Sequence, residues 1–360
     1  HSAAFAIEPI LRHHDPDQVE VYLYSSSERT DGRTDLFKDW GVWRDVAGWT
    51  DAAVDALVME DEIDVLVDLS GLSAGARPFV FARKPAPVQV HAWGYATGTG
   101  MPTIDLFFGD AVVTPPEDDV NFVERVIRLP VFMAYEPPHF TPAVAPPPCL
   151  TNGYVTFGYF GRAVRVGPDA LAAWAKILTA MPNARLYLKD KAWVCEQTAQ
   201  RVRDYLVARG VEDARLRFGG FSERLFHLDE HREIDIALDP FPLSGGITSL
   251  DALWQGVPIV ALLGDRIACR TTASFLYALG LDQYVARSPD AYVWIARRLA
   301  ANTDTLVSLR EGMRARMQAS PLLDHDTYTR AVEAAYRSSW QRYLGTATSS
   351  PKEAPIRSTA

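Results

Sequence analysis

Short apolar runs alternate along the chain with amphipathic segments at helical spacing. The clearest unit spans residues 234–264, where IDIALD predicts a buried strand, ITSLDALW a helix and PIVALLG a second buried strand. Two buried strands joined by a crossover helix form the basic unit of a parallel sheet. The pattern therefore predicts an α/β protein built on parallel sheets.

The same alternation fills two separate stretches of the chain. Five strands are predicted within the first 130 residues, and a second series of strands and helices follows residue 153. Between them, residues 134–153 hold six prolines, which favour an interdomain linker. We therefore expect two doubly wound domains, 1–148 and 149–344, facing each other across a cleft. The small, polar residues 345–360 predict a disordered tail.

Composition limits the functions that this chain can have. A length of 360 residues favours two domains, and a net charge of −9 argues against a nucleic-acid partner. No apolar run approaches the roughly 20 residues needed to cross a membrane. The three cysteines show neither metal-ligand spacing nor a disulfide pattern, which predicts a cytoplasmic protein without a metal site.

A candidate phosphate site opens the helix of the 234–264 unit. Gly245 and Gly246 are followed at once by a helix start that carries the hydroxyls of Thr248 and Ser249. Unpaired N–H groups and the positive end of the helix dipole suit a phosphate there. Asp251, just beyond, is placed to accept hydrogen bonds from a ribose. The alternative interpretation is a tight turn whose hydroxyls cap an ordinary helix.

Three segments of the second half, in this order, resemble a known family. FGYFGRAVRVGPDALAAWAKIL, ARLYLKDKA and DIALDPFPLSGGITSLDALWQGVPIVALLG are similar to the catalytic region of protein O-GlcNAc transferases. The similarity is closer to the SPINDLY-like members of glycosyltransferase family 41. In the first half of the chain, the segment IDVLVDLSGLSAGAR also resembles the family.

The resemblance implies a GT-B fold, in which two Rossmann-like domains bind a nucleotide-sugar in the cleft between them. It implies an inverting, metal-independent transfer of GlcNAc from UDP-GlcNAc to Ser/Thr hydroxyls of a protein. It also implies tetratricopeptide repeats upstream of this region, which would present the acceptor protein.

The resemblance assigns roles to particular residues. Arg165 stands where the family has a lysine at the diphosphate, and His1 matches a histidine that is a candidate general base. Surface charge at Arg165 and packing at His227 are the alternative interpretations. The residues that match nucleotide-sugar contacts are Arg162, Lys189, Arg224, His227, Gly245, Gly246, Thr248, Ser249 and Asp251.

Departures from the family pattern leave other functions open. Phe5 and Asp64 stand where the family has histidines, and Ile247 replaces a threonine of the phosphate loop. His91 is a further candidate base, or a histidine of the core. The alternatives are a GDP-fucose donor and a degenerate scaffold that binds a nucleotide-sugar without catalysis. A dinucleotide oxidoreductase is disfavoured, because no G-x-G-x-x-G follows a predicted strand.

Overall fold

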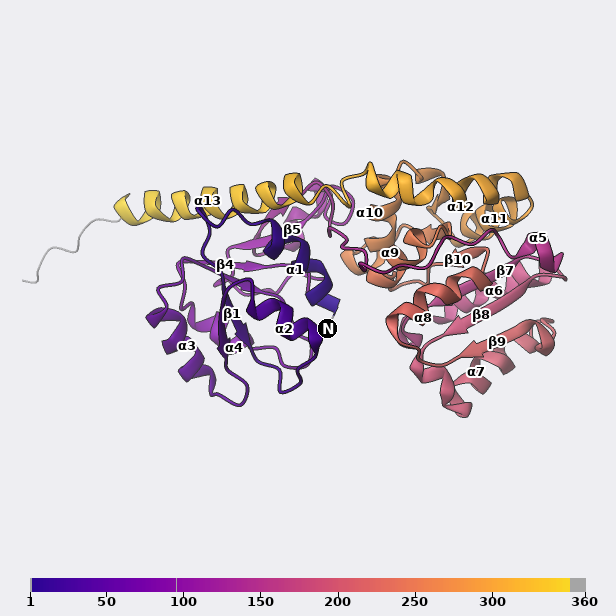
Figure 1. Ribbon diagram of the computed structural model, residues 1–360, viewed down its shortest axis with the longest axis horizontal. Coiled ribbons are helices and arrows are strands. Elements are labelled where there is room, and N and C mark those ends of the chain that lie inside the picture. The colour runs from indigo at the N-terminus through magenta and orange to yellow at the C-terminus, as the bar shows by residue number, and fades with distance from the viewer. Residues whose placement is uncertain (1, 95, 350–360) are drawn as a thin grey trace, which may run out of the picture.

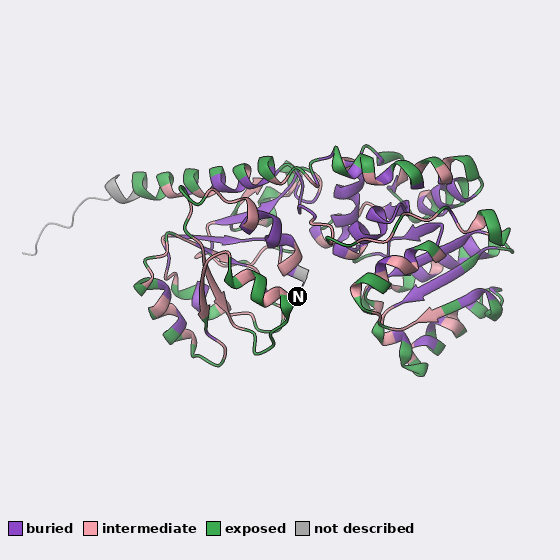
Figure 2. Ribbon diagram, viewed as in Figure 1, coloured by how far each residue is buried: buried purple, intermediate pink, exposed green. Residues whose placement is uncertain are grey.

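The computed structural model describes residues 2–94 and 96–349, which form two α/β lobes lying side by side (Figure 1). The first lobe contains the N-terminal strands, and the second contains every strand from residue 156 onward. All strand pairs within the sheets are parallel, as the buried apolar runs predicted. The strands form the buried interior of the second lobe, and the helices around them expose one face (Figure 2).

The N-terminal lobe has a two-stranded and a four-stranded sheet, in the orders β1-β2 and β3-β4-β5-β6. A short polar segment after β1 leads into helix α2. Asp31 caps α2 by accepting the amides of Arg33 and Thr34, while the Thr34 hydroxyl accepts the Asp31 amide. Strand β2 was not predicted from the sequence. The elements are α1 (Ser2–His13), β1 (Tyr22–Ser25), α2 (Gly32–Lys38), β2 (Val42–Asp45), α3 (Asp51–Glu60), β3 (Val65–Asp68), α4 (Pro78–Arg83), β4 (Val88–His91), β5 (Leu106–Gly109) and β6 (Arg125–Arg128).

The C-terminal lobe is built on one six-stranded sheet in the order β12-β11-β10-β7-β8-β9. The strand order reverses between β7 and β10, which are hydrogen-bonded neighbours. In doubly wound sheets, ligands bind beyond the carboxyl ends of the strands at such a reversal. The strands are β7 (Thr156–Phe160), β8 (Arg185–Lys189), β9 (Leu216–Gly219), β10 (Ile236–Leu238), β11 (Ile259–Leu262) and β12 (Val285–Ala286).

Helices cover both faces of this sheet, and their apolar stripes form its core. Trp174 of α6 is fully buried, and its indole N–H donates to the Tyr292 hydroxyl of α11 at 3.2 Å. Within the described part of the chain, no helix combines the length and the apolar character needed to cross a bilayer. The helices are α5 (Cys149–Asn152), α6 (Pro168–Ala180), α7 (Glu196–Val207), α8 (Arg224–Asp229), α9 (Ile247–Trp254), α10 (Thr271–Ala278), α11 (Pro289–Ala300), α12 (Thr303–Gln318) and α13 (His325–Ser349).

The last helix, α13, leaves the C-terminal lobe and packs on the N-terminal one (Figure 1). We expected it within the C-terminal domain, but its apolar stripe, which includes Tyr328 and Val332, is buried against α1 and β4. The Tyr328 hydroxyl accepts the indole N–H of Trp93 at 2.8 Å. The expected disorder from residue 345 is wrong as far as residue 349, where the helix continues. Residues 350–360 lie outside the described residues.

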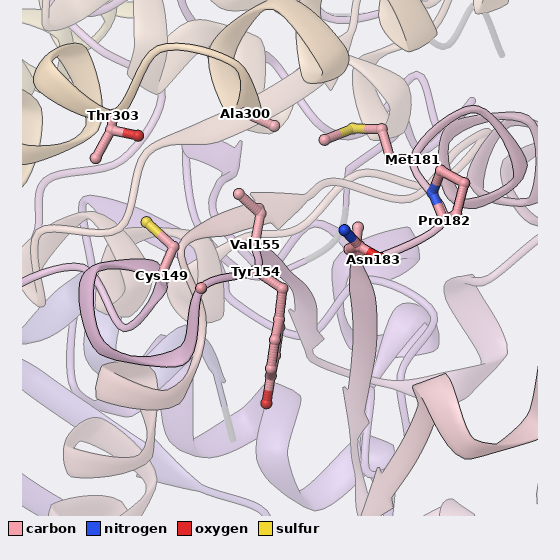
Figure 3. Close-up of a pocket in the computed structure, with 10 residues that line it drawn as sticks. Cys149, Tyr154, Val155, Met181, Pro182, Asn183, Ala300 and Thr303 are labelled. Carbon is pink, nitrogen blue, oxygen red and sulfur yellow. The ribbon is translucent and has the colours of Figure 1, made fainter.

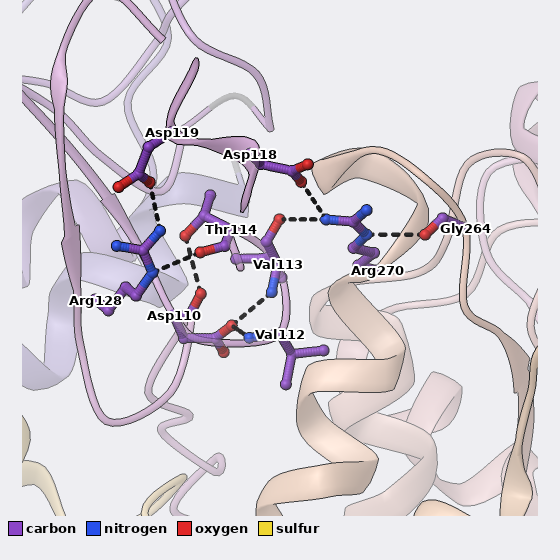
Figure 4. Close-up of polar contacts among 9 residues, drawn as sticks. All are labelled: Asp110, Val112, Val113, Thr114, Asp118, Asp119, Arg128, Gly264 and Arg270. Carbon is purple, nitrogen blue, oxygen red and sulfur yellow. Dashed lines mark hydrogen bonds and ion pairs between the residues drawn. The ribbon is translucent and has the colours of Figure 1, made fainter. Parts of the chain in front are cut away.

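Polar contacts also join the lobes beside the loop that follows β5 (Figure 4). The Arg270 guanidinium donates to the backbone oxygen of Gly264 in its own lobe and to the Asp118 carboxylate across the interface. In the same loop, Asp110 accepts the amides of Val112 and Val113 at 2.8 and 2.7 Å. Its other oxygen accepts the hydroxyl of Ser274 from α10. Charged groups on both lobes therefore set their relative position.

Tyr328→Phe tests how far α13 stabilises the fold. The substitution leaves the buried Trp93 N–H without an acceptor, so we expect the free energy of unfolding to fall by about 1–3 kcal/mol. Urea denaturation at pH 7 measures this loss. Tyr205→Phe is the control, because that hydroxyl makes only a surface contact of 3.5 Å. Equal stability of the two variants would contradict this role of α13.

Candidate active site

Two loops meet where the strand order of the C-terminal sheet reverses. One follows β7 and carries Arg162 and Arg165, and the other follows β10 and leads to Gly245. The Arg165 guanidinium donates to the backbone oxygen of Ser244, so it is held against the second loop. Arg162 is exposed beside it. Arg165 is therefore tied to the phosphate-type loop and is not a freely solvated surface charge.

A buried carboxylate, which the sequence analysis missed, shapes this loop. Asp239 is 3% exposed, and its Oδ1 accepts the Gly245 amide and the Thr272 hydroxyl, each at 2.8 Å. A Cβ atom on Gly245 would lie 2.0 Å from Ser249 Oγ, so only glycine fits there. The sequence signal was an acidic residue directly after the buried strand IDIAL, a position where an uncompensated charge is costly.

Helix α9 begins directly after the loop, and its first backbone N–H groups are unpaired among the described residues. Gly246 precedes the helix, and no side chain caps it. Among the contacts of the described residues, the amides of Gly246, Ile247 and Thr248 have no acceptor. Ser249, which could have capped the helix, instead shares a 3.1 Å hydrogen bond with Thr272 beneath the loop. This arrangement favours an anion site over an ordinary capped helix.

Lys189 and His227 form a second cluster, at the end of β8. Lys189 is 3% exposed and pairs with the Glu230 carboxylate at 2.8 Å. Its ammonium group also donates to His227 Nδ1 at 3.1 Å, so the neutral imidazole carries its proton on Nε2. The hydroxyl of Ser222 accepts a further hydrogen bond from Lys189. Lys189 is thus a buried, paired lysine and not a solvated surface charge.

Burial and the positive charges of Lys189 and Arg224 lower the pKa of His227 to about 4, although Glu230 opposes the shift. The imidazole is therefore neutral near pH 7. It lies 5.1 Å from the ring of His231, which is fully buried. Burial also lowers the pKa of His231 well below its ordinary value.

Arg224 and Asp251 contact each other directly. The guanidinium donates twice to the Asp251 carboxylate, at 3.0 and 2.7 Å, and the Tyr135 hydroxyl donates to the same carboxylate at 2.7 Å. Asp251 is 1% exposed, and its burial raises its pKa, while Arg224 opposes that shift. The predicted ribose contact of Asp251 stays a prediction, since in this structure its carboxylate is occupied by protein groups.

A narrow space lies beneath the loop, lined by residues of β7, β10 and α9 and by His231. Two buried polar atoms at this space, Asp239 Oδ2 and His231 Nε2, have no protein partner among the described residues. Burial raises the pKa of Asp239 to about 7, against the opposing effect of its hydrogen-bond donors. The underside of the loop therefore holds a buried carboxyl group whose surroundings favour its protonated form more than water does.

Two histidines are candidate general bases, and two further positions replace histidines of the family. His1 lies outside the described residues. His91 is 1% exposed, and its Nδ1 is 2.9 Å from the Asp68 carboxylate, so the structure makes it a histidine of the core. Asp64, at a position where the family has a histidine, is exposed, and Phe5 packs against the main core.

A larger pocket of about 390 Å³ lies at the other end of the same sheet, where its strands begin (Figure 3). Tyr154 and Asn183, which line it, come just before β7 and β8. It is therefore at the amino ends of the strands, away from the switch point where such sheets bind ligands. Burial and the nearby Asp235 raise the pKa of the Cys149 thiol, at the rim of this pocket, to about 12.

Two α/β lobes with parallel sheets, and an uncapped helix start at the switch point of the second, are the architecture of GT-B glycosyltransferases. Comparison with known proteins agrees. The profile of the family described as glycosyl transferase family 41 matches residues 1–135 and 148–332. The chain belongs to glycosyltransferase family 41.

Curated relatives include a protein from Oryza sativa named probable UDP-N-acetylglucosamine–peptide N-acetylglucosaminyltransferase SPINDLY. It is 38% identical over 95% of this chain and 38% of its own length. The tomato (Solanum lycopersicum) protein of the same name is also 38% identical over the same shares. This chain thus spans well under half the length of these relatives.

Solved structures show the same fold. A mutant O-GlcNAc transferase from Thermobaculum terrenum is 39% identical, with a TM-score of 0.92 over 96% of this chain and 66% of its own. An Anabaena protein in complex with UDP and glucose has a TM-score of 0.63 over 94% of this chain and 96% of its own. At 12% identity, the second match shows the fold alone.

The depressed pKa of His227 makes stability depend on pH. The unfolded imidazole binds a proton near pH 6.5, whereas the folded one does so only near pH 4. Lowering the pH through this window therefore destabilises the fold, by at most about 3 kcal/mol. We expect His227→Gln to lose less stability between pH 7 and 4.5 in urea denaturation. The exposed His139→Gln is the control, and a parental slope in His227→Gln would contradict the assignment.

Proposed function

We propose that this chain is the catalytic region of an enzyme that transfers GlcNAc from UDP-GlcNAc to Ser/Thr hydroxyls of a protein. The observation that carries the proposal is the uncapped start of α9, with Arg165 tied beside it. Family membership and the names of the relatives supply the reaction class. The nucleotide-sugar would lie with its diphosphate on this loop.

The chemistry of the proposed reaction matches the charges at the loop. Cleavage of the sugar–phosphate bond leaves extra negative charge on the nucleoside diphosphate. The amides of Ile247 and Thr248 and the guanidinium of Arg165 would stabilise that charge without a metal ion. We further propose that the acceptor hydroxyl attacks from the opposite face of the sugar, which inverts the configuration at the anomeric carbon.

Roles at the two ends of the donor follow from the clusters around the loop. We propose that neutral His227, with its proton on Nε2, faces the nucleobase and that Lys189 holds it in this tautomer. Arg224 would contribute positive charge toward the diphosphate. A ribose contact by Asp251 requires it to share its carboxylate with Arg224 and Tyr135.

The altered residues of the loop do not by themselves favour the alternative of a degenerate, non-catalytic scaffold. Ile247 replaces a threonine of the family loop, but its side chain is 9% exposed and belongs to the hydrophobic core. Its backbone amide, the group that would reach a phosphate, is unchanged by the substitution. Ser244, in the same loop, accepts the amide of Thr271 at 3.0 Å and so helps to cap α10. Ile247 and Ser244 thus have structural roles, and neither side chain takes up the N–H groups of the proposed anion site.

The biological setting is also a proposal. We propose a cytoplasmic enzyme whose acceptor proteins are presented by the upstream repeats that the family resemblance implies. The three cysteines are free thiols, which suits a reducing compartment. A GDP-fucose donor remains the competing reading within the same family.

Titration with nucleotides tests the donor. We expect UDP to raise the melting temperature more than GDP does, because a ligand that binds only the folded state stabilises it. The shift should persist in EDTA if no metal is needed. A larger shift with GDP would favour the fucose donor, and no shift with either nucleotide would contradict the proposed site.

Arg165→Ala tests the diphosphate contact. Loss of a charge-assisted hydrogen bond should weaken UDP binding roughly 10- to 100-fold in isothermal titration. Arg165→Lys should bind more tightly than Arg165→Ala, because it keeps the charge. Arg201→Ala, at an exposed position of α7, is the control. Parental affinity in Arg165→Ala would place the diphosphate elsewhere.

A further inference from the structure

The ring of Phe5 contacts two positive charges that come from different lobes. Its ring centroid is 4.0 Å from the guanidinium carbon of Arg33 in α2 and 4.5 Å from that of Arg224 in α8. Both distances are within the range of a cation–π interaction, for which about 6 Å is the limit. The aromatic ring of α1 is therefore the contact between the N-terminal lobe and an arginine of the candidate donor site.

Each arginine also has a carboxylate partner. Arg33 pairs with Glu8, which lies on α1 three residues after Phe5 and is 4% exposed. Arg224 pairs with Asp251, which is 1% exposed. The result is a row of five side chains that runs from one lobe to the other. It consists of a carboxylate, a cation, a ring, a cation and a carboxylate, from Glu8, Arg33, Phe5, Arg224 and Asp251.

The identity of residue 5 follows from this arrangement. The two guanidinium groups are near enough to affect each other. Burial lowers the pKa of Arg33, and the positive charge of Arg224 lowers it further. A phenyl ring attracts both cations through its negative faces. An imidazolium at the same place would add a third positive charge, which both arginines would repel. A protonated histidine at this position would therefore be incompatible with the contact to both arginines.

We infer that Phe5 is a positioning residue that holds Arg224 at the donor site and couples nucleotide binding to the packing of α1 between the lobes. Phe5 acts through Arg224, whose guanidinium its ring contacts. The inference rests on the proposed donor site, because the position of Arg224 matters for function only if the diphosphate binds beside it. A change at Phe5 then alters the affinity for nucleotide even though the loop itself is intact.

A double-mutant cycle on UDP affinity tests the inference. Phe5→Leu keeps an apolar side chain but removes the ring, and we expect UDP binding to weaken about five-fold, as expected for a partly buried cation–π contact. Phe5→Tyr keeps the ring and should bind close to the parent. In the Arg224→Ala background, Phe5→Leu should cause no further loss, because its partner is gone.

The outcomes separate this inference from the proposed function. Parental affinity in Phe5→Leu, or an equal loss in both backgrounds, overturns the positioning role. Parental affinity in Arg224→Ala refutes both that role and the place of Arg224 in the donor site. If the parent binds no UDP, the proposed function fails. The same double-mutant cycle, measured on the free energy of unfolding, then tests whether Phe5 and Arg224 interact. Additive losses of stability there would show that Phe5 and Arg224 do not interact.

Discussion

The pairing of β7 with β10 is the constraint on which the rest of the site depends. Because the strand order reverses there, the segments leaving the two strands diverge to opposite faces of the sheet and leave a gap at its carboxyl edge. Arg165 enters that gap from one side and the amino end of α9 from the other. No other adjacent pair of strands in this sheet brings two such loops together, within the described residues.

Buried carboxylates hold this edge of the sheet in shape. Asp239 secures the loop by accepting the Gly245 amide, and Asp251 secures α8 against α9 through Arg224. A buried charge is costly unless it is paired or hydrogen-bonded, so each carboxylate constrains its donors strongly. These hydrogen bonds fix the loop in one conformation in this structure, and a loop that is already ordered would lower the entropic cost of the nucleotide binding proposed above.

The two lobes are connected by more than the proline-rich linker. Helix α13 crosses back to β4, Arg270 reaches Asp118, and the Phe5 stack joins α1 to α8. These contacts come from three separate elements of the N-terminal lobe, β4, the loop after β5 and α1. The last of them reaches Arg224, a residue of the proposed donor site.

The sequence by itself determined the parallel α/β class, the order of most elements and the glycine loop, because buried strands, helix periodicity and Gly-Gly turns are local patterns. It also pointed to Arg165 and Lys189 through their resemblance to a known family. Only the tertiary structure decided which side chains meet. The pairing of Arg224 with Asp251, the support of Gly245 by Asp239 and the stack on Phe5 join residues from separate elements. The return of α13 to the N-terminal lobe was likewise hidden, because an amphipathic stripe shows that a helix packs but not against which partner.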